Sequence, residues 1–160
     1  MLRGLDAAGV GFVVVGGVAA GAQGATFVTL DLDICYDTAQ DSVTRLAQLL
    51  ASWHAYPRGI EPGLPFFMDA RTFRTTPVMT LETSEGAIDV LDRINGVGKF
   101  ADVLAASVPL QSFGVRFRVL KLPALIRAKR AAGRPKDVAQ LPELEALVAL
   151  RKKGGGKKKP

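Results

Sequence analysis

Two aspartates, Asp31 and Asp33, stand two residues apart in an apolar run from Phe27 to Tyr36. Side chains alternate between the two faces of a β-strand, so a strand over this run places both carboxylates and Thr29 on one face. Neighbouring carboxylates repel each other, and a divalent cation such as Mg²⁺, which takes oxygen ligands, makes their arrangement favourable. The spacing therefore predicts a divalent-cation site. The opposite, core-facing side of the strand would carry Leu30, Leu32 and Ile34.

A third carboxylate, Asp89, lies between apolar residues in a second predicted strand, Ala87 to Asp92. A carboxylate inside a strand is costly unless it meets a cation or hydrogen-bond donors. Asp92 has the opposite strand parity and is interpreted as the strand end. Asp89 is therefore a second position in the chain at which the pattern predicts that a carboxylate binds a cation or accepts hydrogen bonds.

The Asp31–Asp33 pair is preceded by a strand and a glycine-rich turn. Phe12 to Val15 is short, β-branched and closed by Gly16 and Gly17, which is typical of a buried strand. The small-residue segment Val18 to Gln23 follows at once and is predicted to be a short helix that begins at Gly17.

This order of strand, glycine pair, short helix and Thr-x-Asp-x-Asp resembles the nucleotidyltransferase superfamily, which includes DNA polymerase beta and many small bacterial transferases. The resemblance is greatest to a small group that contains abortive-infection-type toxins and related transferases. Many members of that group carry a basic residue two positions before the threonine, where this chain has Phe27. The matching residues here are Gly16, Gly17, Thr29, Asp31 and Asp33.

The resemblance implies an α/β (α+β) fold, with a mixed twisted sheet flanked by helices and a C-terminal helical pair. It implies an enzyme that moves a nucleoside monophosphate from a nucleoside triphosphate (NTP) to an acceptor hydroxyl, releasing pyrophosphate. Asp31, Asp33 and Asp89 would hold Mg²⁺ or Mn²⁺, and the glycine pair would approach the triphosphate. The toxin-like group further implies tRNA as an acceptor, and an antitoxin or a second copy of the chain as a partner.

A segment near the C-terminus extends the resemblance. Lys129, Arg134 and Asp137 match the K-x-x-x-x-R-x-x-D pattern that follows the catalytic core in the same small transferases. By that resemblance Lys129 would reach the nucleotide phosphates, and Asp137 would hold Arg134 or Lys129 in place. The alternative is an ordinary surface helix pair with an Asp–Arg contact of small energy. Either way, residues 122–150 are predicted to form two helices separated at Gly133.

Three other interpretations of the motif are open. A dinucleotide-binding Rossmann unit also has a glycine-rich turn after a strand, with an acidic residue that could be Asp37, but Val18 stands where its central glycine belongs. The two aspartates could also face solvent on a structural hairpin. Finally, a catalytically silent module could keep the fold in order to bind a nucleotide or a partner. Loss of Mg²⁺-dependent triphosphate affinity on Asp31→Asn would separate the transferase from the Rossmann unit.

Two stretches between the aspartate motifs are less informative. Arg58 lies in a loop rich in proline and glycine, where it could touch a phosphate or simply be solvated. Two further strands are predicted before Asp89, at Phe66 to Asp69 and at Val78 to Thr83.

The length and the charge distribution of the chain limit how many domains it can form. At 160 residues, of which 48% are hydrophobic, residues 1–150 suffice for one domain with its own core. Six of the 21 basic residues fall within Arg151 to Pro160, which leaves 15 basic against 15 acidic residues in the remainder. Residues 151–160 are predicted to be a disordered basic tail, which could add affinity for nucleic acid or be a solvated or non-native end.

The cysteine and histidine counts and the lack of long apolar runs argue against several classes of site and of protein. A single cysteine, Cys35, forms no internal disulfide and fits a reducing compartment, and a single histidine, His54, argues against a zinc site or a His-based triad. No run is long enough to span a membrane, and the first residues show no export signal. A cytoplasmic protein without a membrane partner is therefore expected.

Overall fold

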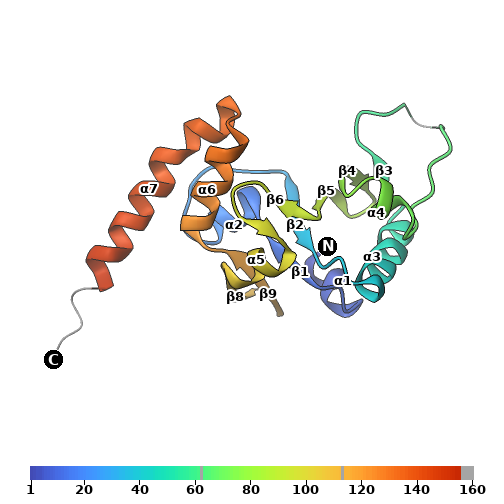
Figure 1. Ribbon diagram of the computed structural model, residues 1–160, viewed down its shortest axis with the longest axis horizontal. Helices are drawn as coiled ribbons and strands as arrows, with labels where there is room; N and C mark the ends of the chain where they lie inside the picture. The colour runs from blue at the N-terminus through green and yellow to red at the C-terminus, as the bar shows by residue number, and fades with distance from the viewer. Residues whose placement is uncertain (62, 113, 156–160) are drawn as a thin grey trace.

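The elements that hold the predicted motifs form one mixed sheet with helices around it (Figure 1). The computed structural model describes residues 1–61, 63–112 and 114–155. The helices are α1 (Leu2–Ala7), α2 (Gly16–Gly21), α3 (Gln40–Ser52), α4 (Thr72–Thr75), α5 (Phe100–Ala105), α6 (Leu122–Ala132) and α7 (Pro135–Gly155). The strands of the large sheet are β1 (Phe12–Val14), β2 (Asp31–Tyr36), β3 (Tyr56–Pro57), β4 (Val78–Thr83), β5 (Gly86–Leu91), β8 (Ser107–Ser112) and β9 (Val115–Leu120). A separate small ribbon pairs β6 (Arg93–Ile94) with β7 (Gly98–Lys99).

The strand order in the large sheet is β3-β4-β5-β2-β1-β9-β8. The pairs β2–β5 and β1–β9 are parallel, and the other neighbours are antiparallel. In a Rossmann unit the strands on either side of the glycine turn run parallel to each other. Here β1 and β2 are antiparallel, with Val14 opposite Ile34, so the Rossmann alternative is wrong.

The core lies along the central strands. Fully buried side chains come from each of the three strands around the aspartate motifs, β1, β2 and β5: Val13, Val14, Ile34, Ile88 and Val90. β1 is apolar throughout, whereas β4 and β5 alternate buried with more exposed residues, which is the two-residue period of a strand. The strands predicted at Phe12 to Val15, Val78 to Thr83 and Ala87 to Asp92 are found within one residue of those bounds.

The strand predicted from Phe27 to Tyr36 begins only at Asp31. Its pairing explains the difference, because β5 meets β2 from Asp31 onward and β1 pairs only with its end, from Ile34 to Tyr36. Residues 25–30 therefore have no strand partner and run as an irregular segment. The core-facing position predicted for Leu30 is wrong, since its side chain is 92% exposed.

The strand predicted at Phe66 to Asp69 is absent. The Asp69 carboxylate instead accepts hydrogen bonds from the backbone N–H groups of Arg71 and Thr72, both at 2.9 Å, and thereby organises the turn into α4. The edge position beside β4 is taken by the two-residue strand β3. The apolar side chain of Phe67 is left 78% exposed.

The C-terminal helical pair forms as predicted, with α6 ending at Gly133 in the left-handed conformation (φ +63°). However, α7 continues to Gly155, where the sequence predicts a disordered tail from Arg151. Arg151 contacts the segment after α2: its guanidinium donates to Gln23 Oε1 at 3.0 Å and to the Gln23 carbonyl at 2.8 Å. The rest of the predicted tail, residues 156–160, lies outside the described residues.

Across the described part of the chain, we find no helix that is both long and apolar enough to cross a membrane.

Candidate active site

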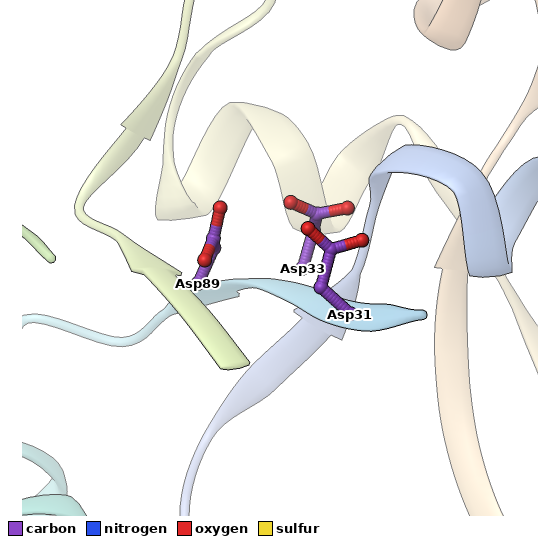
Figure 2. A group of neighbouring side chains, drawn as sticks. All are labelled: Asp31, Asp33 and Asp89. Atoms are coloured by element: carbon purple, nitrogen blue, oxygen red, sulfur yellow. The ribbon is translucent and has the colours of Figure 1, made fainter. Parts of the chain in front are cut away.

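Three carboxylates meet on one face of the sheet. Asp31 and Asp33 rise from β2 and Asp89 rises from the neighbouring β5, all toward the same side (Figure 2). Each contributes one oxygen to a group whose members all lie within 4.8 Å of one another. The parallel register places Asp33 directly beside Asp89, and the two-residue period of β2 brings Asp31 onto the same face. The structure thus brings together the three aspartates that the sequence predicts as ligands.

The glycine turn is packed against this group. Gly16 has a φ of +59°, and a β-carbon there would lie 2.0 Å from Asp33 Oδ2. A β-carbon on Gly17 would lie 2.7 Å from the β-carbon of Thr29. Both glycines are therefore required for steric reasons, because the start of α2 passes directly over the acidic residues. In addition, the backbone of Gly17 stabilises the charged form of Asp33 by hydrogen bonding.

The three carboxylates have different electrostatic environments. A hydrogen bond from the Thr29 hydroxyl, aided by the charge of Arg58, holds the pKa of Asp31 below its ordinary value. Burial and then the charges of the other two aspartates raise the pKa of Asp33 to about 6. Burial also raises the pKa of Asp89, although Arg58 partly opposes this. Two of the three groups are thus unfavourable as bare anions.

The group fits a divalent cation. Asp89 Oδ1 is buried and, among the described residues, has no hydrogen-bond partner of good geometry. Buried polar oxygens are normally satisfied, so this one is suited to a ligand. A set made only of carboxylate oxygens suits hard cations such as Mg²⁺ and Mn²⁺ rather than zinc, which is more often bound through nitrogen or sulfur. The residues present are therefore compatible with the predicted Mg²⁺ or Mn²⁺.

Arg58 is the residue whose position the sequence did not settle. It is not simply solvated, because it pairs with acidic residues. Its guanidinium lies 3.1 Å from Asp89 Oδ1 and 3.6 Å from Asp31 Oδ2, and it also pairs with Glu82 at 3.0 Å. The only local signal was an arginine in a loop, because the strands that bring it to the aspartates are remote in sequence.

A second polar cluster comes from α6 and α7. Lys129 is buried, and its Nζ donates to Asp137 Oδ1 at 3.2 Å and to Gln140 Oε1 at 2.5 Å. Arg134 pairs with the other oxygen of Asp137 at 2.5 Å. Burial would raise the pKa of Asp137, but the hydrogen bonds from Arg134 and Lys129 outweigh it, so this pKa lies below its ordinary value. Asp137 therefore holds both cations, whereas the sequence left open which of the two it would hold.

The two clusters line one cavity of about 570 Å³. Beside the aspartates and the Lys129 cluster, its wall includes both glycines of the turn and Phe27. The ring centroid of Phe27 lies 5.4 Å from Lys129 Nζ, so the aromatic ring makes a cation–π contact with the ammonium group of this cluster. The polar lining residues that no sequence pattern singled out include Arg93, Asn95, Lys136 and Gln140.

The pKa of Asp33 predicts an unusual pH dependence of stability. Its folded-state pKa of about 6 lies above the ordinary value of 3.8, so the folded state holds this proton more tightly than the unfolded state. In chelator, the stabilisation from this proton is complete below about pH 4 and is lost as the pH rises through about 6, at a cost of about 3 kcal/mol. Thermal melts at intervals across this range measure it. Asp33→Asn should reduce the decline to the part that the raised pKa of Asp89 contributes, and a wild-type melting temperature that rises over the same interval would contradict the prediction.

Comparison with known proteins supports the fold. No protein-family model matches the chain, and neither does any curated protein. Among solved structures, the chain is similar to a protein from Thermotoga maritima whose name assigns it provisionally to the nucleotidyltransferases. The two share 15% sequence identity with a TM-score of 0.56, over 89% of this chain and 88% of the other. At this identity the likeness concerns the architecture: this chain has a nucleotidyltransferase-like fold.

Proposed function

We propose that the protein is a Mg²⁺-dependent nucleotidyltransferase that moves a nucleoside monophosphate from an NTP to an acceptor hydroxyl. The observation that carries the proposal is the group of three aspartates on adjacent strands, in a nucleotidyltransferase-like fold. The same cavity wall carries the buried Lys129, which supplies a positive charge to the cavity. A catalytically silent module that bound only a partner protein would need none of the unfavourable charge that Asp33 and Asp89 retain.

In this proposal Asp31, Asp33 and Asp89 hold the cation or cations. Bound Mg²⁺ would neutralise the triphosphate and stabilise the entering and leaving oxygens of an in-line displacement at the α-phosphorus. The acceptor oxygen forms a bond to the α-phosphorus and loses its proton, while the bond from the α-phosphorus to the bridging oxygen breaks and pyrophosphate leaves. Thr29 keeps Asp31 ionised and oriented through its hydroxyl, while Gly16 leaves Asp33 the space it occupies and Gly17 does the same for Thr29.

Lys129 is assigned to the phosphates of the nucleotide. An ammonium group has three N–H donors, and two of them serve Asp137 and Gln140. The third remains for a phosphate oxygen. Asp137 positions Lys129 and Arg134 together, so the nucleotide would meet a charged pair that is already fixed in place. Preorganisation of this kind lowers the ordering cost of binding.

Lys129→Met is expected to weaken NTP affinity by about 10- to 100-fold, the loss of one charge-assisted hydrogen bond. Methionine keeps most of the aliphatic stem, and Asp137 keeps Arg134 as a partner, so the fold should persist. Equilibrium titration with each NTP in Mg²⁺ measures the effect. Lys121→Met is the matched control, because Lys121 is an exposed lysine just before α6 and does not line the cavity. Equal affinities of the two variants would remove Lys129 from the nucleotide site.

The acceptor is proposed to be tRNA, with support only from the resemblance to the toxin-like group. The test is incubation of the protein with each labelled NTP, Mg²⁺ and total tRNA, beside an Asp31→Ala/Asp33→Ala control. Label on the RNA that is absent from the control would identify both the base and the acceptor. Label on the protein itself, or on neither, with Mg²⁺-dependent NTP binding intact, would reject tRNA and direct the search to protein or small-molecule hydroxyls. An antitoxin or a second copy of the chain is proposed as a partner on the same ground.

A further inference from the structure

Arg58 is held across the outer strands and reaches toward the aspartates. Its backbone N–H donates to the carbonyl of Thr80 at 2.9 Å, which extends the pairing of β3 with β4. Its Nε pairs with Glu82 at 3.0 Å, and its Nη2 donates to the carbonyl of Leu81 at 3.3 Å. The guanidinium therefore lies over β4 and approaches the aspartates from the side of Asp89.

The far end of the same guanidinium lies between two of the three carboxylates. Nη2 is 3.1 Å from Asp89 Oδ1, and Nη1 is 3.6 Å from Asp31 Oδ2. Asp89 Oδ1 is the buried oxygen that has no well-formed hydrogen bond among the described residues. Arg58 thus places a positive charge beside this oxygen without donating a well-formed hydrogen bond to it. The side chain is 32% exposed, so solvent is available to it if it leaves.

We infer that Arg58 is an internal cation that a divalent metal ion must displace from Asp31 and Asp89. This inference rests on the proposed function, because it concerns the same carboxylates. Two cations within a few ångströms of each other repel, and each carboxylate oxygen that faces the guanidinium is withdrawn from a metal. Glu82 is not one of the three clustered aspartates. It therefore keeps its ion pair with Arg58 Nε when the far end of the arginine side chain moves away. Arg58 is therefore a positioning residue that tunes metal affinity.

The inference predicts that Arg58→Gln binds Mn²⁺ about five-fold more tightly than the wild type, the equivalent of about 1 kcal/mol, as expected for one partly exposed ion pair. Calorimetric titration of the full chain with Mn²⁺ alone, at about pH 8 where carboxylates are ionised, measures the affinity. A second readout is thermal. Without metal, Arg58→Gln should melt below the wild type because the carboxylates lose their counter-charge, and Mn²⁺ should raise its melting temperature by more.

Two further variants test whether the effect depends on the charge, the shape and the position of the arginine side chain. Arg58→Lys keeps the charge but cannot bridge two carboxylates with a planar fork, so its Mn²⁺ affinity should fall between those of the wild type and Arg58→Gln. Arg74→Gln makes the same change of charge at an exposed arginine on α4 and should leave the affinity unchanged.

The outcomes separate this inference from the proposed function. If Arg58→Gln binds Mn²⁺ as the wild type does, or more weakly, while Asp33→Asn loses binding, the metal site stands and the role of Arg58 is refuted. If the wild type does not bind Mn²⁺, or binds it no better than Asp33→Asn, both the inference and the proposed metal site are refuted.

Discussion

Asp33→Asn is expected to lose nucleotidyl transfer by about 10³-fold while the protein stays folded, because the group lost acts on charge that develops in the reaction. Asp33 is the central ligand candidate, placed beside Asp89 by the strand register and beside Asp31 by the strand period. The amide has the same shape but no charge, so the cation would be held by two carboxylates instead of three.

The same substitution should stabilise the protein in chelator at neutral pH. Burial and two neighbouring carboxylates raise the pKa of Asp33, which means that its charge opposes folding. A gain in melting temperature together with a loss of activity would identify a residue retained for chemistry rather than for stability. Asp6→Asn, an exposed aspartate on α1, is the control and should change neither quantity. Full activity in Asp33→Asn would contradict the assignment of the site.

Gly16→Ala is the second substitution with a large expected effect. Its β-carbon would lie 2.0 Å from Asp33 Oδ2, and its φ of +59° would add about 1–2 kcal/mol of backbone strain. Asp33 must therefore move, and misplacement of a catalytic group by about 1 Å costs about 10²-fold in rate. We expect Mn²⁺ affinity, transfer activity and melting temperature all to fall.

Gly21→Ala provides the matched control within the same helix. A β-carbon at Gly21 would meet nothing within 4 Å, and alanine favours a helix over glycine by about 1 kcal/mol. This variant should keep full activity and melt at or above the temperature of the wild type. If Gly16→Ala behaved like Gly21→Ala, the steric account of the glycine turn would be wrong.

The parts of this site that could be predicted from sequence are those set by local periodicity. The two-residue spacing of Asp31 and Asp33 follows from the strand itself, and the apolar neighbours of Asp89 place it inside another strand. The mixed sheet flanked by helices was reached through the resemblance to a known fold, and the structure confirms it.

The parts that could not be predicted depend on partners that are distant in the chain. Residues 27–30 look like a continuation of β2, but a strand needs a neighbour, and β5 reaches back only as far as Asp31. Arg58 is brought to the aspartates through the pairing of β3, β4 and β5, which no local pattern encodes. Likewise, Gln140 is an ordinary helix residue until the packing of α6 against α7 places it on Lys129.

The central claim is transfer of the nucleotidyl group, and the position of the label in the NTP tests it most directly. Parallel reactions would use the same NTP, labelled at the α-phosphorus in one and at the γ-phosphorus in the other, with Mg²⁺ and an acceptor. We expect the α-label to move to the acceptor and the γ-label to appear in pyrophosphate, and both signals to vanish in Asp33→Asn. A γ-label on the acceptor, or transfer that persists in Asp33→Asn, would contradict this expectation.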